Sequence, residues 1–287
     1  PKKLLLVDIS ENAIYEINEK LLKIKKSDIE VKPLIGSVAD TNFMSQVIKK
    51  WKPDLIYHAA AYKHVPMVEL NVAKGVENNI FGTLNIAQLA IKYNVPKLVL
   101  ISTDKAVNPT NVMGATKRVA ENILQALKKK TLNSKTNFII VRFGNVLNSS
   151  GSVIPKFKKQ IISEGPVTLT HPEITRYFMT IPEAAQLVIQ SAGMSTLSDD
   201  VPTEIFVLDM GEPVKIIELA KNMIELMGFT VMDKSHPNGD IKIKIIGLRA
   251  GEKLYEELLI GDNPIKTGHP KIIKAHENFI LWNVLEK

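Results

Sequence analysis

The stretch Leu98-Val99-Leu100-Ile101-Ser102-Thr103-Asp104-Lys105 decides the fold. Four apolar residues typical of a buried strand are followed at once by two hydroxyls, an acid and an amine. Four more apolar runs have the length of strands, and stretches of helical period separate them. The runs span residues 4–7, 29–35, 55–60, 98–102 and 138–143, and the helical stretches span 13–24, 43–51, 65–93 and 112–127. This alternation predicts an α/β fold, a doubly wound parallel sheet with helices on both faces.

After Gly144 the alternation loosens, and six prolines between Pro155 and Pro213 interrupt shorter elements. Pro and Gly mark turns and element boundaries, so the second half indicates a smaller α/β lobe. We therefore expect a sheet domain over residues 1–146 and a lobe over 147–287. We also expect residues 182–209 to return to the sheet.

The composition excludes several classes of protein. With 45% hydrophobic and 23% charged residues the chain is globular. It contains no Cys, which excludes disulfides, thiolate metal sites and a cysteine nucleophile, and favours a cytoplasmic setting. No apolar run approaches the roughly 18 residues of a membrane span. The net charge of +7 is scattered, which favours solvated helix faces over a nucleic-acid site, and the six His have no metal-ligand spacing.

Ligands of open parallel sheets bind beyond the carboxyl ends of the strands. Asp8 ends the first apolar run. Its carboxylate is suited to the ribose 2′-hydroxyl of a dinucleotide such as NAD, or equally to capping the next helix. Ala59-Ala60-Ala61 ends the third run and allows close approach of a pyrophosphate or ribose, or simply tight packing.

Two further groups of residues could carry chemistry. Thr103-Asp104-Lys105 offers general acid–base groups, with a local ion pair as the alternative. Met113 and Lys117 are four residues apart, so they share one helix face. Lys117 either projects into a cofactor cleft or is an ordinary surface lysine.

The glycines narrow the choice of nucleotide-binding motif. No two of the fifteen lie closer than Gly247 and Gly251, so the sequence contains no G-x-G-x-x-G. It also has neither a Walker A loop nor a G-x-S-x-G elbow, which excludes P-loop NTPases and α/β-hydrolases.

Six segments together resemble the extended short-chain dehydrogenase/reductase family, and within it the CapD-like UDP-N-acetylglucosamine 4,6-dehydratases of polysaccharide biosynthesis. These segments are His58–Pro66, Asn79–Thr83, Ser102–Arg118, Arg142–Leu147, Gly151–Pro155 and Thr175–Met179. The resemblance extends from about Lys3 to Leu259. Its most specific part is the Ser-Thr-Asp-Lys-Ala segment with the Met-Gly-Ala-Thr-Lys that follows.

The resemblance implies a redox-neutral reaction with retained NAD. The sugar is oxidised at C4, water is eliminated across C5 and C6, and the hydride returns to C6. Asp104 would protonate the departing hydroxyl and Lys105 would take the C5 proton. Where most of the family has Tyr-x-x-x-Lys this chain has Met113 and Lys117, as in a membrane-associated branch, so Thr103 assisted by Lys117 would act at the C4 hydroxyl.

The resemblance also implies binding residues. NAD would contact Asp8, Asp40, Ala59, Ala60, Ala61, Asn79, Lys117 and Phe143. The UDP-sugar would contact Lys63, Asn145, Val153, Arg176, Arg249 and Glu252. The segment Arg-Ala-Gly-Glu-Lys that holds Arg249 differs from the family's pattern only by Ala for Pro. No metal, and no nucleic-acid partner, is expected.

Other properties follow from the same resemblance. The long helical stretches 65–93 and 112–127 suggest a homo-oligomer. Whether a region outside this sequence tethers the protein to a membrane is left open.

In the family Asp8 would lie about 20 residues after a glycine-rich loop, but only seven residues precede it here. We therefore expect the central first strand and its loop to lie outside this sequence. Two alternatives remain, a UDP-sugar C4-epimerase and a non-catalytic NAD or nucleotide-sugar-binding regulator.

Overall fold

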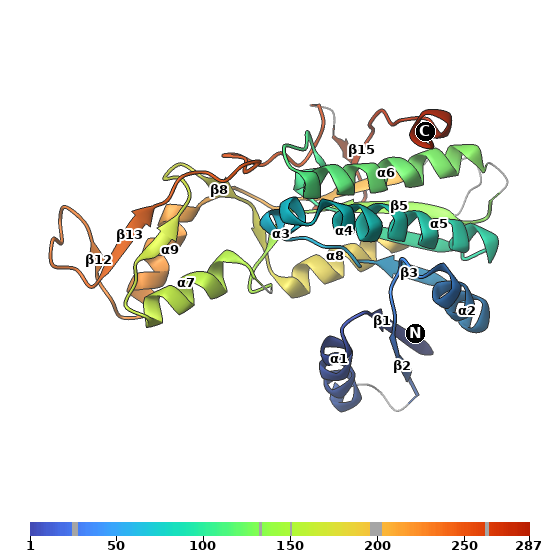
Figure 1. Ribbon diagram of the computed structural model, residues 1–287, viewed down its shortest axis with the longest axis horizontal. Coiled ribbons are helices and arrows are strands. Elements are labelled where there is room, and N and C mark those ends of the chain that lie inside the picture. Colours follow the sequence, from blue (N-terminus) through green and yellow to red (C-terminus); the bar gives the residue numbers. More distant parts are fainter. Residues whose placement is uncertain (25–27, 132–133, 150, 196–202, 262–263) are drawn as a thin grey trace.

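The computed structural model of this chain describes residues 1–24, 28–131, 134–149, 151–195, 203–261 and 264–287. Its largest sheet has six strands in the order β14-β15-β10-β5-β4-β3 (Figure 1). The strands are β3 (Leu55–His58), β4 (Lys97–Ile101), β5 (Asn137–Arg142), β10 (Glu204–Leu208), β15 (Ile272–Ala275) and β14 (Ile265–Lys266). The first four are parallel, and β15 and β14 continue the sheet antiparallel. The predicted fold class is confirmed.

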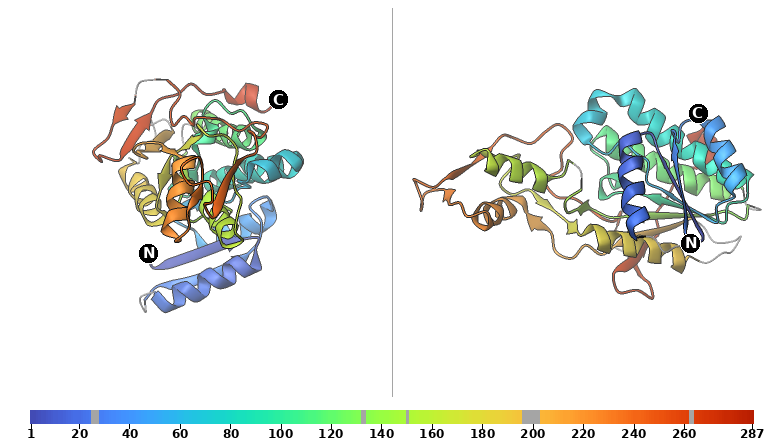
Figure 2. Two further views of the ribbon diagram at one scale, coloured as in Figure 1. Left: turned by 90° about the vertical axis from the view of Figure 1, so that its left-hand side faces the viewer. Right: turned by 90° about the horizontal axis from the view of Figure 1, so that it is seen from below.

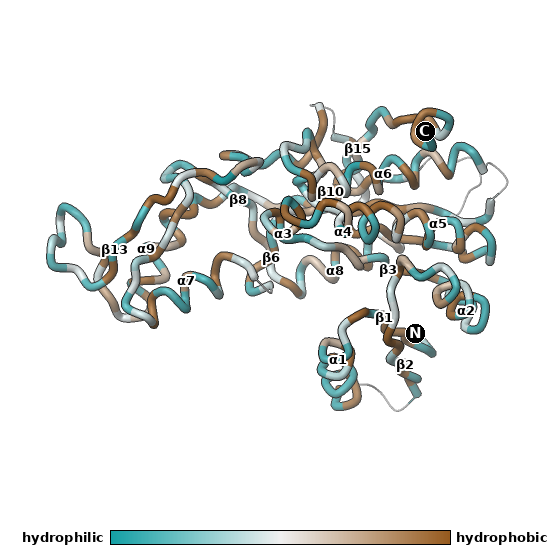
Figure 3. The backbone as a smooth tube through the Cα atoms, in the orientation of Figure 1, coloured by the Kyte–Doolittle hydropathy of each residue, from teal (hydrophilic) through white to brown (hydrophobic). Residues whose placement is uncertain are grey.

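Both faces of the sheet are buried. Leu98 and Leu100 of β4 belong to a core on the side of α5 (Gly82–Lys92) and α6 (Val112–Lys130). Val99, which points the other way, belongs to a second core beneath α8 (Ile181–Met194). Burial on both faces explains why these strands are continuous apolar runs. Figure 3 shows apolar residues gathered around the sheet and its covering helices.

The stretch 65–93 is not one helix. It divides into α3 (Val65–Leu70), α4 (Val72–Val76), the π-helical turn η1 (Glu77–Phe81) and α5. The break lies at Asn71, whose φ of −135° and ψ of 51° are not helical. The π-turn carries Asn79, which is 1% exposed and faces α6. The irregular backbone thus accompanies a buried amide that the helical period could not predict.

The amino-terminal unit forms a sheet of its own. It consists of β1 (Lys3–Asp8), α1 (Glu11–Ile24) and β2 (Glu30–Ile35), followed by α2 (Thr41–Trp51). β1 and β2 pair in parallel, and among the described residues neither pairs with β3. In Figure 1 this unit lies below β3 and α2. The carboxyl ends of β1 and β3 therefore lie on two separate sheets.

A second lobe extends from one end of the large sheet, as Figure 2 shows. Its core lies between α7, α9 and a three-stranded sheet. Its elements are α7 (Val153–Ile162), β7 (Val167–Leu169), α9 (Ile216–Leu226), β12 (Val231–Met232) and β13 (Ile241–Ile245). Two small strand pairs connect it to the sheet, β6 (Asn145–Val146) with β9 (Phe178–Met179) and β8 (Thr175–Arg176) with β11 (Val214–Lys215).

Two segments of the second half lie in the large sheet. β10 pairs with β5, within the region 182–209. β15 and β14 also join this sheet, although residues 265–275 fall in the sequence range assigned to the lobe. The terminal helix α10 (Trp282–Leu285) follows them. None of the described helices is long and apolar enough to cross a bilayer.

Candidate functional site

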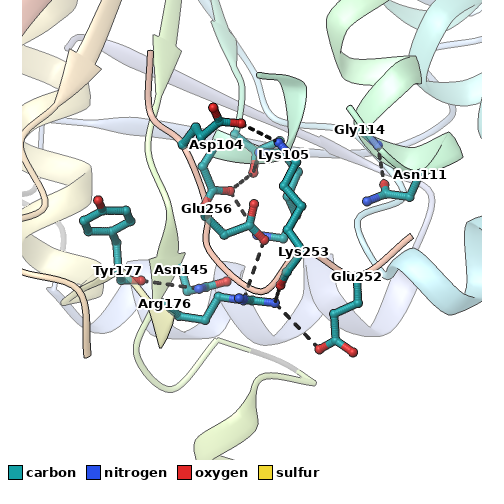
Figure 4. Close-up of polar contacts among 12 residues, drawn as sticks. Asp104, Lys105, Asn111, Gly114, Asn145, Arg176, Tyr177, Glu252, Lys253 and Glu256 are labelled. Atoms are coloured by element: carbon teal, nitrogen blue, oxygen red, sulfur yellow. Dashed lines mark hydrogen bonds and ion pairs between the residues drawn. The ribbon is translucent and has the colours of Figure 1, made fainter. Parts of the chain in front are cut away.

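The carboxyl end of β4 brings three predicted side chains together. Thr103 caps the 3-10 turn η2 (Asp104–Ala106) in an extended conformation. Its hydroxyl donates to Asp104 Oδ1 at 2.8 Å, and Lys105 Nζ donates to the same oxygen at 2.9 Å (Figure 4). Asp104 is fully buried. A hydroxyl, a carboxylate and an amine therefore form one hydrogen-bonded group at the strand end.

Neighbouring glycines make this arrangement possible. Gly114, in the first turn of α6, packs so closely that a Cβ there would collide with the Lys105 carbonyl oxygen. Asn111 caps the same helix by accepting from Gly114 N at 2.8 Å. On the other side, a Cβ on Gly144 would lie 3.1 Å from Asp104 Oδ2. Gly114 is therefore required for the close approach of α6 to Lys105, and Gly144 leaves a tight space beside Asp104.

Met113 and Lys117 share a buried face of α6, at 3% and 6% exposure. Lys117 Nζ donates to the Ile101 carbonyl at 2.6 Å. Burial lowers the pKa of Lys117 to about 8, partly opposed by the charge of Glu121. No hydrogen bond joins Lys117 to Thr103 among the described residues. Lys117 is thus no surface lysine, and its amine lies beneath the end of β4.

The two histidines near the strand ends have structural contacts. His58 Nε2 lies 2.9 Å from Thr83 Oγ1, and burial, assisted by the charge of Lys117, lowers the His58 pKa to about 3. A neutral imidazole is therefore expected there at all physiological pH values. The ring of His64 lies where a Cβ on Gly151 would collide with it, which holds the Gly151 loop against the segment after β3. Among the described residues no cluster of acidic and His side chains could hold a metal.

The expected NAD contacts fall into two groups. Asp8 is exposed and its Oδ1 accepts from Ser10 N at 2.8 Å, while Ser10 Oγ accepts from Ala13 N at the start of α1. Ser10, rather than Asp8, therefore occupies the capping position. Asp40 caps α2 by accepting from Phe43 N at 2.9 Å.

The other expected contacts surround the end of β3. Asn79 donates to the Tyr62 carbonyl and to Thr116 Oγ1, both at 3.0 Å, and accepts from Tyr62 N. It therefore fixes the loop that contains Ala59, Ala60 and Ala61, whose small side chains are exposed or half-buried. Phe143 is half-buried and packs in the core under α8, and its carbonyl accepts from Asp104 N at 3.2 Å.

These residues can be compared with what NAD requires. An exposed carboxylate at Asp8, small side chains at Ala59 to Ala61 and the buried amine of Lys117 suit the ribose and nicotinamide portions. The pyrophosphate is usually held by a glycine-rich turn at a helix N-terminus, and residues 1–287 contain no such turn. The residues present therefore suit the ribose and nicotinamide portions of the dinucleotide, and no glycine-rich turn of these residues holds the pyrophosphate between them.

The expected UDP-sugar contacts lie where the lobe meets the sheet. Arg176 Nη2 lies 3.6 Å from Glu252 Oε1 and donates to the Lys253 carbonyl at 2.9 Å. Glu252 also accepts from Thr170 Oγ1 at 3.0 Å and from Arg249 N at 3.1 Å. Asn145 donates to the Tyr177 carbonyl at 3.3 Å. Arg176, Asn145 and Glu252 thus line the side of the site opposite Asp104 (Figure 4).

The remaining expected contacts border this group. Arg249 and Lys63 are exposed, and Val153 begins α7 with its side chain against the lobe core. Lys156, one turn further along α7, was not predicted. Burial lowers its pKa, and so does the charge of Arg249, while Glu252 raises it. Lys156 therefore lies within electrostatic reach of both Arg249 and Glu252.

Glu256 is the second residue that the sequence analysis missed. Its side chain is 3% exposed, and Oε1 lies 3.3 Å from Lys105 Nζ and 3.6 Å from Arg176 Nε. It connects the strand-end group with the lobe (Figure 4). No local pattern distinguishes it from its neighbour Glu257, which is half exposed.

Sequence comparison gives a family and two informative relatives. The sequence model of the family described as "Polysaccharide biosynthesis protein" matches residues 1–277. The chain is 53% identical to the capsular polysaccharide biosynthesis protein CapD of Staphylococcus aureus over 259 residues, which cover 90% of the chain and 41% of CapD. It is 34% identical to a UDP-glucose 4-epimerase of Rickettsia bellii over 266 residues, 91% of the chain and 72% of the epimerase. The chain thus spans less than half the length of CapD.

Two solved structures share the fold. Pen from Bacillus thuringiensis is 33% identical, with a TM-score of 0.82 over 96% of this chain and 80% of Pen. DesIV from Streptomyces venezuelae, a dTDP-glucose 4,6-dehydratase solved with NAD bound, is 17% identical, with a TM-score of 0.71 over 90% of this chain and 79% of DesIV. The predicted Rossmann-type fold is confirmed by both, and the second likeness extends to the fold alone.

Proposed function

The chain belongs to the polysaccharide biosynthesis protein family, and we propose that it carries the catalytic site of an NAD-dependent UDP-N-acetylglucosamine 4,6-dehydratase. The observation that carries the proposal is the buried group at the end of β4, where Thr103 and Lys105 both donate to Asp104 Oδ1. Elimination of water needs one group that removes a proton and another that protonates the leaving hydroxyl. This strand end supplies both.

Each side chain receives a role from its chemistry. Asp104 would protonate the departing C6 hydroxyl, as a carboxyl group does in general acid catalysis. Lys105 would take the C5 proton, which a C4 ketone acidifies. Thr103 would hydrogen-bond the C4 hydroxyl because the thioether of Met113 cannot exchange a proton. Lys117 would contact the nicotinamide ribose.

NAD supplies reversible hydride acceptance, from the sugar C4 and back to C6. The residues that would hold it are Asp8, Asp40, Ala59 to Ala61, Asn79, Lys117 and Phe143. Support comes from DesIV, which shares the fold and was solved with NAD. The UDP moiety would lie against Lys63, Asn145, Val153, Arg176, Arg249 and Glu252, with Lys156 as an additional cation.

The test is incubation of the full-length protein with NAD and UDP-N-acetylglucosamine in deuterated water. The dehydratase gives a 4-keto-6-deoxy product with solvent deuterium at C5, measured by NMR and mass spectrometry. Recovery of unchanged substrate and its C4 epimer, without a keto product, would contradict the proposal.

A UDP-sugar C4-epimerase is the second candidate, because the R. bellii relative with that name is 34% identical to the chain. An epimerase uses the same C4 oxidation but removes nothing at C5 or C6. It therefore needs no acid and base of the kind that Asp104 and Lys105 provide, which favours the dehydratase. A regulator without activity would give neither product.

We further propose a homo-oligomer that uses the helices after β3. Met67, Leu70 and Phe81 are 59%, 80% and 57% exposed on this segment. Large apolar side chains grouped in this way are typical of interfaces between subunits. Light scattering of the purified protein would test this, and a monomer at micromolar concentration would contradict it.

A further inference from the structure

Glu256 is a buried carboxylate with one unsatisfied oxygen. Its Oε1 lies between Lys105 Nζ, at 3.3 Å, and Arg176 Nε, at 3.6 Å. Its Oε2 has no hydrogen-bond partner among the described residues. An unpaired buried polar atom costs free energy, so its presence calls for an explanation. In Figure 4 Glu256 lies between Lys105 and Arg176.

The loop that carries Glu256 is fixed by other contacts. The Gly251 carbonyl accepts from Thr110 Oγ1 at 2.9 Å and from Asn111 Nδ2 at 3.1 Å. Lys253 Nζ donates to the Val107 carbonyl at 2.9 Å. These three bonds hold the loop against the segment that follows Lys105. Contacts other than the Glu256 side chain therefore also dock the loop.

Resting on the proposed function, we propose that Glu256 is the positioning residue of the C5 proton transfer: it orients Lys105 and stabilises the ammonium that Lys105 becomes when it takes the proton. An activated base is commonly oriented by a third group of opposite charge. Here Asp104 and Glu256 approach Lys105 Nζ at 2.9 and 3.3 Å. Arg176 Nε lies 3.6 Å from the same oxygen of Glu256, Oε1.

The step balances with groups of the chain. The C5–H bond breaks, a bond forms between that proton and Lys105 Nζ, and its electrons form the C5–C6 double bond as the C6 hydroxyl leaves with a proton from Asp104. Positive charge thus appears on Lys105 as Asp104 becomes negative. Glu256, whose carboxylate is not consumed, stabilises that charge throughout.

The charges around Lys105 link its proton affinity to Glu256. Burial by itself would lower the pKa of Lys105, but attraction to Asp104 and Glu256 outweighs it and raises the pKa, with Arg176 acting in the opposite direction. Removing the charge of Glu256 should therefore lower the pKa of Lys105.

The experiment compares Glu256→Gln with wild type in the full-length, NAD-loaded protein. On the plateau above the acid limb, where Lys105 is a free amine in both proteins, we expect kcat for 4-keto formation to fall about 10- to 100-fold with KM changed less than about threefold. The acid limb of the pH profile should move to lower pH. Glu256→Asp keeps the charge and should hold the limb near its wild-type position. Glu257→Gln, the exposed neighbour, is the matched control and should behave as wild type.

A second measurement does not depend on turnover. NMR of lysine-labelled protein, with the Lys105 signal assigned through Lys105→Arg, reports the Lys105 pKa directly, and Glu256→Gln should lower it. Absence of a keto product in wild type would refute the proposed function. The NMR titration of Lys105 would then be the test of whether Glu256 acts on Lys105. An unchanged Lys105 pKa, or an unchanged kcat and acid limb in an active wild-type background, would overturn it.

Discussion

Replacing Glu277 by Gln would test a buried charge network behind the strand ends. Arg142 is fully buried at the end of β5 and donates to Glu121 and to Glu277, with Nη2 to Glu277 Oε2 at 2.8 Å. Arg118 Nη1 donates to Glu277 Oε2 at 2.7 Å. Glu121 also accepts from Ser102 Oγ at 2.6 Å, directly before Thr103. The network therefore ties the segment after β15 to the end of β4.

The expected cost follows from the charges. Two guanidiniums and two carboxylates balance, and Glu277→Gln leaves two cations with one anion. Removing one partner of a buried ion pair costs about 3–5 kcal/mol. Glu121 still lies 2.6 Å from Arg142 and 3.1 Å from Arg118, so we expect the lower end, about 3 kcal/mol.

The assay is urea unfolding followed by circular dichroism, with Glu286→Gln as the control. Glu286 is half exposed and 3.8 Å from Lys130, a surface pair for which about 0–1 kcal/mol is typical. At neutral pH a loss below about 1 kcal/mol in Glu277→Gln would refute the argument.

The pH dependence provides a second check on the same variant. Burial alone would raise the pKa of Glu277, but hydrogen bonds and attraction from Arg142 outweigh it and hold the pKa below the ordinary 4.5. The folded state thus binds this proton less readily than the unfolded state, so the stabilisation is complete above pH 4.5 and is lost as the pH falls through the folded pKa. The difference between wild type and Glu277→Gln should narrow below pH 4.5. A constant difference would show that the charge of Glu277 is not its source.

The remaining predictions concern the site. Thr103→Val removes the hydroxyl bonded to Asp104 and should lower turnover about 100-fold or more. The affinity for the UDP-sugar, measured by calorimetry, should stay unchanged. Wild-type rates would exclude Thr103 from the C4 step. Gly114→Ala should lower the free energy of unfolding in urea by about 1–3 kcal/mol, because the new Cβ would collide with the Lys105 carbonyl. Gly193→Ala is the control. A Cβ at Gly193, in α8, has no atom within 4 Å, so this variant should be neutral or stabilising. NMR of labelled lysines should place the Lys117 midpoint at about 8, and a midpoint above about 10 would contradict its burial. Calorimetry of residues 1–287 with NAD should show binding weaker than about 1 mM, since no glycine-rich turn is present to hold the pyrophosphate; tight binding would contradict this.

Much of the fold could be predicted because its strands are buried on both faces. Residues 98–100 and 138–141 are fully buried, so their apolar runs mark β4 and β5 without ambiguity. The break in the stretch 65–93 could not be predicted. The same stretch contains the π-turn with Asn79, whose partners Tyr62 and Thr116 lie 17 and 37 residues away in the sequence.

Some residues of the candidate site could be predicted from the sequence and others could not. Thr103, Asp104 and Lys105 are consecutive, so a strand end that presents one must bring all three close together. Glu256 reaches Lys105 across some 150 residues of sequence, through a loop that docks by Gly251 on Thr110 and Asn111 and by Lys253 on Val107. Lys156 could have been predicted as a site residue, because it lies one helical turn after Val153, which we expect to contact the UDP-sugar.

The Met113 substitution explains why the site is arranged around Asp104. In a Tyr-x-x-x-Lys pair the helix supplies the group that exchanges a proton, with the lysine beside it. Here Met113 is 3% exposed and cannot exchange a proton, and Lys117 is bonded to the Ile101 carbonyl. The polar hydrogens that remain at the strand end, from Thr103 and Lys105, both converge on Asp104 Oδ1. In the proposed function, proton transfer would therefore be organised by the end of β4, while α6 contributes the close packing at Gly114 and the buried amine of Lys117.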